Sequence, residues 1–130
     1  MKKPISKKIR LELTQDNFVV VVANDLKEGF DLLKSENDIL KEYEFPEEHN
    51  GCEAVCFPQT ENFGVAVIFK YKRLKASFIV HEVTHATNAV LLNVGIELND
   101  STDEIFAYHN DMLFRFCTEF MKENNLRIKI

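Results

Sequence analysis

The sequence predicts a compact α+β domain, because strand-like and helix-like segments alternate along one chain of 130 residues. A β-branched run at 18–24 and two apolar segments at 53–57 and 63–71 have the composition of strands. Two uninterrupted helical patterns follow at 75–94 and 101–124. There are no repeats and no low-complexity linker, so residues 1–130 should form a single domain with a real core.

The first half of the chain should begin with a buried strand at 18–24 and continue into an amphipathic helix. Helical spacing of apolar residues extends over 26–43, and the helix should end before Pro46. The polar stretch 58–62 separates the strands at 53–57 and 63–71 and should form a turn. The apolar residues that carry the helical spacing are Phe30, Leu33, Ile39 and Leu40.

The second half should contain two long helices. Residues 75–94 contain neither Pro nor Gly, and Gly95 follows where a helix commonly takes a left-handed residue at its C-terminus. The second helix should extend over 101–124. The tail 126–130 alternates like a strand, although a frayed end is an equal alternative.

Composition and charge limit the class of protein and the partners that can be expected. With 45% hydrophobic and 28% charged residues, the chain has an ordinary soluble globular composition. A net charge of −5 argues against nucleic acid as a partner. The basic residues near the start, like the acidic ones in the middle, are more typical of a solvated face than of a binding arm. The basic residues are Lys2, Lys3, Lys7, Lys8 and Arg10.

Neither a secretory signal nor a membrane span is expected, since the apolar run 18–23 is short and is followed at once by polar residues. The three cysteines cannot all pair within one chain, which indicates free thiols in a reducing cytoplasm. Cys52 and Cys56 have a loosely metal-like spacing without a partner pair, so small buried hydrophobic side chains are the favoured role.

The most informative motif is His81-Glu82-Val83-Thr84-His85, which has the HExxH pattern. Residues four apart share one face of a helix, so both imidazoles can converge on one metal ion with Glu82 beside them. The alternative is a helix carrying two histidines that touch no metal. Two histidines and one carboxylate would leave a fourth zinc position open, as in catalytic sites.

Glu104 is the candidate third ligand, nineteen residues after His85 at the start of the second helix. The same carboxylate could instead close a capping box with Ser101. With Asp100 as the N-cap, Glu104 would be free to bind the metal. Ligation is the favoured alternative.

These residues resemble the gluzincin kind of zincin metallopeptidase, including the short HExxH proteins encoded by bacteria and their phages. The resemblance covers about 63–121. It implies a small, mostly antiparallel sheet packed on the HExxH helix and a following helix that carries a ligand. It also implies Zn²⁺ held by His81, His85 and Glu104, and a peptide or protein substrate. The resemblance places the sheet edge beside the cleft near 64–69, although an ordinary interior strand is at least an equal alternative for this segment. The position four residues after Glu104, often Asp in gluzincins, is Tyr108.

The expected activity is hydrolysis of a peptide bond, with Glu82 as general base. Tyr108 should share the face of Glu104 and could stabilise an oxyanion or support a ligand, or be a half-buried core residue. His109 and His49 are expected to lie outside the site. Two alternatives stay open: hydrolysis of a non-peptide amide, and an inactive zincin-like module that binds metal and serves interaction or regulation.

Overall fold

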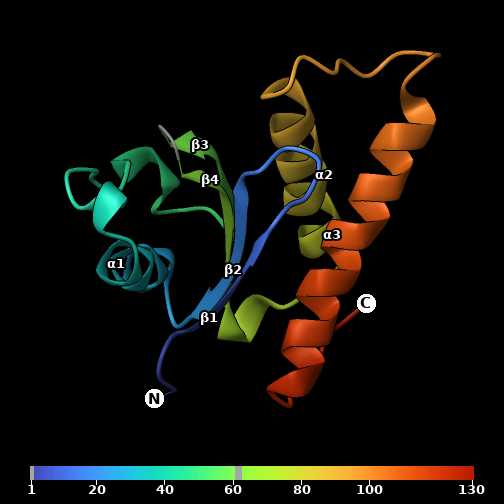
Figure 1. Ribbon diagram of the computed structural model, residues 1–130. Helices are drawn as coiled ribbons and strands as arrows, with labels where there is room; N and C mark the ends of the chain where they lie inside the picture. Colours follow the sequence, from blue (N-terminus) through green and yellow to red (C-terminus); the bar gives the residue numbers. More distant parts are fainter. Residues whose placement is uncertain (1, 61–62) are drawn as a thin grey trace.

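The computed structural model describes residues 2–60 and 63–130 and confirms an α+β architecture (Figure 1). The strands are β1 (Ile5–Arg10), β2 (Asn17–Ala23), β3 (Ala54–Thr60) and β4 (Gly64–Lys70). The helices are α1 (Leu26–Glu36), α2 (Ala76–Leu92) and α3 (Asp103–Glu123). Short 3-10 turns occur at Asp38–Leu40, Glu47–His49 and Tyr71–Arg73. Residues 61–62, part of the expected turn at 58–62, lie outside the described residues, and 58–60 belong to β3.

The sheet is mixed, with strand order β1-β2-β4-β3. Two of its pairings, β1 with β2 and β4 with β3, are antiparallel, as the expectation of a mostly antiparallel sheet requires. The central pairing of β2 with β4 is parallel. Helix α1 covers one face of the sheet, while α2 and α3 cover the other (Figure 1).

Strands β2 and β4 are the interior strands, which explains their unbroken apolar sequences. Side chains alternate between the two faces of a strand, so Phe18 and Val20 face α2 and α3, whereas Val19 and Val21 face α1. Both faces are covered by helices, so every one of these side chains is buried. The sequence-based strand at 18–24 is confirmed within one residue.

Helix α1 is shorter than predicted. It ends at Glu36 rather than near 43, because Asn37 takes an extended conformation with φ −140°. The side-chain amide of Asn37 donates to the carbonyl oxygen of Leu33 at 2.8 Å and satisfies the helix end. The chain continues in a 3-10 turn that buries Leu40 and leaves Ile39 exposed, so the apolar spacing beyond 36 does not reflect one helix.

The basic start of the chain forms β1, a strand that the sequence pattern did not predict. It pairs along its length with β2 at one edge of the sheet. Lys7 forms an exposed ion pair with Glu123 of α3 at 3.1 Å. At the other end of the chain, the tail forms a single bridge, in which Lys129 pairs with Lys75 just before α2.

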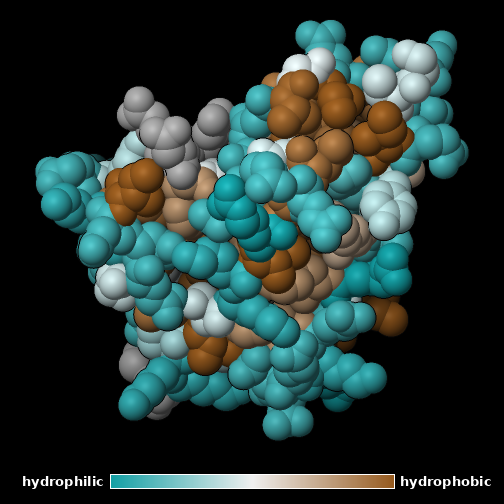
Figure 2. All heavy atoms as spheres, in the orientation of Figure 1, coloured by the Kyte–Doolittle hydropathy of each residue, from teal (hydrophilic) through white to brown (hydrophobic). Residues whose placement is uncertain are grey.

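Helix α2 ends as the sequence predicts, close to Gly95, whose φ of +79° is in the left-handed region. The segment from Asn93 to Thr102 then connects α2 to α3. Exposed apolar residues lie within and beside this connection. They are Leu92, Val94, Leu98 and Ile105. Figure 2 shows hydrophobic surface gathered at that end of the molecule. Within the described residues, none of the helices combines the length and apolarity that crossing a bilayer would demand.

Candidate metal centre

Helix α2 presents His81 and His85 side by side on its surface. The two residues are four apart, and their Nε2 atoms lie 3.2 Å from each other. Two nitrogen ligands bound at about 2.0–2.1 Å to a tetrahedral ion lie about 3.3 Å apart. The two imidazoles therefore already have the separation that a shared tetrahedral metal ion would impose.

Glu82 completes a compact group with the two histidines. The ligand atoms of His81, Glu82 and His85 all lie within 4.8 Å of one another, so the group could hold a metal ion. Glu82 is only 6% exposed, and its Oε2 atom has no hydrogen-bond partner among the described residues. Buried polar atoms are rarely left unpaired, and this one suggests a site for an ion, a water molecule or a ligand.

The environment of Glu82 favours its protonated form. Burial raises the pKa of this carboxyl group above its ordinary value of 4.5, because desolvation penalises the charged form. The nearby imidazoles of His81, His85 and His49 act in the opposite direction and lower the pKa. The burial contribution is the largest, so the net shift is upward.

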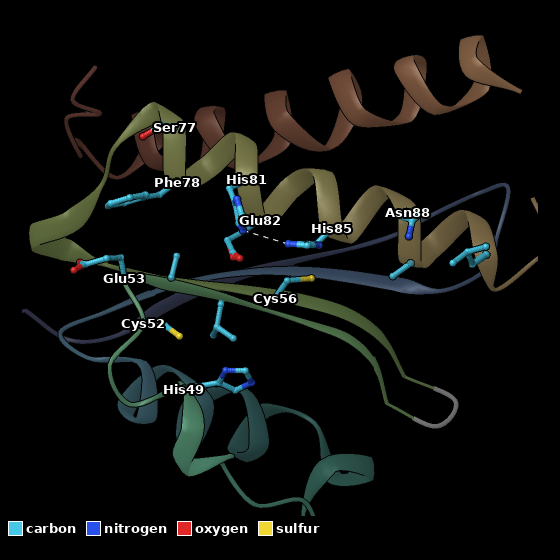
Figure 3. A pocket seen from close by; sticks show the side chains of 14 residues that line it. His49, Cys52, Glu53, Cys56, Ser77, Phe78, His81, Glu82, His85 and Asn88 are labelled. Carbon is cyan, nitrogen blue, oxygen red and sulfur yellow. Dashed lines mark hydrogen bonds between the residues drawn. The ribbon is translucent and has the colours of Figure 1, made fainter. Parts of the chain in front are cut away.

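The group opens into a cleft of about 810 Å³ between α2 and β3 (Figure 3). Helix α2 forms one wall. The other wall consists of β3 and the segment before it, from His49 to Glu53. Much of the lining is apolar and is supplied by Ala54, Val55, Phe78, Ala89 and Leu92.

The strand that borders the cleft at the sheet edge is β3. The segment 64–69 is not this edge, because β4 pairs with β2 on one side and with β3 on the other, and the alternative of an ordinary interior strand is confirmed. Strand β3 ends the strand order and pairs with β4 alone in the described part of the chain. Its outer edge is therefore the one that lies next to the histidines.

The structure does not bring Glu104 into the group formed by His81, Glu82 and His85. Glu104 precedes the buried residue Leu113 by nine residues, and nine steps of about 100° place it about half a turn away from the core. Its side chain is accordingly exposed. Ligation by Glu104 stays a prediction from the sequence.

The start of α3 also differs from both capping alternatives. Thr102 occupies the N-cap position, and neither Asp100 nor Ser101 does. The Thr102 hydroxyl instead accepts a hydrogen bond from the backbone N–H of Asn99 at 2.9 Å and orders the turn before the helix. The capping-box interpretation and the Asp100 N-cap are therefore both wrong.

Tyr108 lies on α3 away from the cleft. It is 65% exposed, and its ring contacts His109 with centroids 5.5 Å apart. The Nδ1 atom of His109 lies 2.8 Å from the carbonyl oxygen of Ile105, within its own helix. The half-buried alternative for Tyr108 is wrong, and its proposed catalytic role has no support from its position.

Two residues that the sequence interpretation left outside the site line the cleft. His49 stands edge-on to Phe57, with centroids 5.7 Å apart, and is near enough to Glu82 to influence its pKa. Cys56 projects from β3 below His85 (Figure 3). Burial, and secondarily the charge of Glu82, raise the pKa of the Cys56 thiol to about 12. No sequence spacing links either residue to the motif, which begins 25 or more residues later.

The three cysteines are free thiols, as expected. Cys117 is buried between α3 and the sheet and acts as a small core residue, and burial raises its pKa. The cleft thus combines paired imidazoles, a buried carboxylate and an apolar lining, an arrangement able to bind a metal ion beside an acid–base group. Comparison of the chain with models of known protein families, with curated proteins and with solved structures found no match.

Proposed function

We propose that this protein is a zinc-dependent hydrolase that cleaves peptide bonds. The observation that carries the proposal is the unpaired Oε2 atom of Glu82, buried beside two imidazoles whose Nε2 atoms are 3.2 Å apart. A metal site kept only for stability has no need of a buried, unpaired carboxylate next to its ligands. The pairing of metal-ligating nitrogens with a potential base is what hydrolysis of an amide requires.

His81 and His85 would hold the ion through their Nε2 atoms. Zinc fits this donor set, because imidazole nitrogen is among its usual ligands and the observed spacing matches tetrahedral geometry. When bound, zinc lowers the pKa of water and polarises a substrate carbonyl. The remaining chemistry then falls to residues of the chain.

Glu82 would move the proton in both halves of the reaction. Its carboxylate takes a proton from water as the water oxygen bonds to the carbonyl carbon. The protonated carboxyl then gives that proton to the leaving nitrogen as the C–N bond breaks, which yields an acid and an amine. Burial suits Glu82 to this exchange, because a raised pKa lets the carboxyl group hold the proton more readily between the two steps.

An extended peptide is the substrate that the cleft favours. The outer edge of β3 offers backbone groups to an added strand, and main-chain hydrogen bonds of this kind need little sequence preference. Side chains of such a strand would alternate between α2 on one side and the segment around His49 on the other. Phe78, Ala89 and Leu92 would favour an apolar substrate side chain on the α2 side.

An inactive, metal-binding interaction module is the second candidate, and the position of Glu104 favours it. Glu104 lies outside the group of ligand atoms, which leaves only two histidines and Glu82 there. If Glu82 were itself the third ligand, it could not act as a free base. The two candidates differ in what removal of the Glu82 charge does to metal binding.

The test is a comparison of Glu82→Gln with His81→Ala and His85→Ala. Zinc per chain is measured by elemental mass spectrometry, and hydrolysis is measured on a library of quenched fluorescent peptides. The hydrolase predicts that Glu82→Gln keeps about one zinc and loses at least about a hundredfold in kcat/KM, a usual range for a general base. Loss of zinc in Glu82→Gln together with an inactive wild type would support the module instead.

A further inference from the structure

We infer that Cys56 is the third metal ligand of this centre and supplies a thiolate from the strand wall opposite the two histidines. The inference rests on the proposed metal centre and names its missing donor. The two histidines lie on one wall of the cleft, and with Glu82 kept as a base they provide only two of the three protein ligands usual in a catalytic zinc site. A third donor must therefore reach the same space from elsewhere.

The alternation of side chains along β3 directs Cys56 toward the histidines. Ala54 and Cys56 pack against the core cluster that contains Val83 and Ala86 of α2, whereas Val55 and Phe57 belong to the cluster on the α1 side. Among the β3 residues whose side chains the structure describes, Cys56 both faces α2 and carries a potential ligand atom. Figure 3 shows its sulfur in the space between the strand and His85.

The other potential donors of the β3 wall make side-chain contacts away from His81 and His85. Glu53 forms an ion pair with Arg73 at 2.6 Å. Cys52 packs against the cluster on the α1 side. His49 is held edge-on between the rings of Phe45 and Phe57, at centroid distances of 6.2 and 5.7 Å. Cys56 alone among these lining residues packs with the same core cluster as α2.

An independent observation points to a ligand in this space. The Oε2 atom of Glu82 is buried without a partner in the same cleft, and Glu82 is 6% exposed. An ion bound between the histidines and Cys56 would have Glu82 beside it. The unpaired oxygen would then face a water molecule or substrate at that ion.

Binding requires the thiol to move. Cys56 is outside the group whose ligand atoms lie within 4.8 Å of one another. Rotation of a cysteine about χ1 between staggered rotamers moves its sulfur by about 3 Å. Cys56 lines the open cleft into which this rotation would carry its sulfur, and the thiol would release one proton to solvent as the thiolate binds. Thiolate and imidazole together select zinc over harder ions such as magnesium.

The test uses cobalt(II) as a spectroscopic substitute for zinc, added to the reduced, metal-free protein. A thiolate ligand gives cobalt an intense charge-transfer absorption in the near ultraviolet, which nitrogen and oxygen ligands do not give. Wild type, Cys52→Ser and Glu104→Ala should show this absorption, and Cys56→Ser should lose it. Cys52→Ser is the matched control, because Cys52 lines the same cleft but packs toward α1.

Cobalt affinity provides a second readout. Removal of an outer-shell partner commonly costs 10–100-fold in metal affinity, and loss of a direct ligand should cost at least about as much. Cys56→Ser should therefore bind cobalt at least tenfold more weakly than Cys52→Ser. A misfolded Cys56→Ser variant would also lose metal, so zinc ligation is measured in the unmodified wild type as well. X-ray absorption at the zinc edge should show a sulfur atom about 2.3 Å from the zinc ion.

Three outcomes would overturn the inference, and they separate it from the proposed function. If wild type binds cobalt through His81 and His85 without the charge-transfer absorption, Cys56 is not a ligand, but the proposed metal centre is still supported. Loss of metal in Glu104→Ala with retention in Cys56→Ser would assign the third ligand to α3. Wild type that binds neither cobalt nor zinc would overturn the metal centre and the inference together.

Discussion

The side chains of Thr87 on α2 and Asn110 on α3 meet at 2.9 Å, between the two helices. Thr87 is fully buried, and its hydroxyl also lies 2.9 Å from the carbonyl oxygen of Val83. This contact fixes which face of α2 receives α3. The face that carries His81 and His85 is left for the cleft and β3.

Replacement of Thr87 by Val should destabilise the protein by roughly 0.5–1.5 kcal/mol, because the partly buried Asn110 loses its hydrogen bond to the Thr87 hydroxyl. The measurement is the free energy of unfolding in urea. Thr84→Val is the matched control, since Thr84 lies in the same helix, is exposed, and donates its hydroxyl to the Val80 carbonyl oxygen within α2. Equal losses in both variants would show that the contact between the helices contributes nothing.

In the metal-free protein, the carboxyl group of Glu82 should titrate above pH 4.5, the ordinary pKa of a glutamate carboxyl group. Burial raises the pKa of Glu82, because desolvation penalises its charged form. NMR titration of the side-chain carboxyl carbon in the presence of a chelator measures this pKa. Titration of Glu82 at or below pH 4.5 would contradict its burial.

Glu82→Gln should stabilise the metal-free protein at neutral pH. A carboxyl group with a raised folded pKa binds its proton more tightly in the folded state, so stability falls as pH rises from 4.5 through the folded pKa. Relief of the buried, unpaired charge should add on the order of 1–3 kcal/mol at pH 7, or several degrees in Tm.

The gain in stability from Glu82→Gln should shrink toward zero below pH 4.5, because Glu82 is then protonated in both the folded and the unfolded wild type. Thermal unfolding at pH 7 and pH 4, in the presence of a chelator, measures both values. Glu104→Gln provides the control, because Glu104 is exposed on α3. A loss of stability in Glu82→Gln at pH 7 would contradict the assignment of an uncompensated buried carboxylate.

Gly64→Ala should destabilise the sheet by more than about 1 kcal/mol, since Gly64 has a φ of +130° at the start of β4. A Cβ atom there would lie 2.1 Å from the backbone oxygen of Asn17 on β2. Gly51→Ala is the control, because its Cβ would meet nothing within 4 Å. The difference between their urea midpoints measures the effect, and equal midpoints would argue against this close approach of β2 and β4.

The parts of the fold that could be predicted from the sequence are those with strong periodicity or a clear end signal. The buried run of β2 and the uninterrupted pattern of α2 closed by Gly95 both appear within about two residues of their expected bounds. The paired histidines follow from spacing alone, because four residues span about one helical turn.

What could not be predicted depends on contacts between distant segments. Helix α1 stops at Asn37, whose side chain caps the helix and also accepts from Lys8 of β1, a partner 29 residues away. Strand β1 is polar on its exposed side and becomes a strand through its pairing with β2. His49 and Cys56 reach the cleft because β3 folds back against α2. This contact between distant segments cannot be predicted from the local sequence.

Every described residue that lines the cleft lies between His49 and Leu92, a stretch of 44 consecutive residues (92 − 49 + 1). The segments before and after it supply β1 and β2 of the sheet and the helices α1 and α3 that cover it, and their described residues add no side chain to the cleft wall. The candidate site is therefore encoded in one continuous block of sequence. Substitutions outside this block should leave the cleft in place, provided that the sheet is still buried.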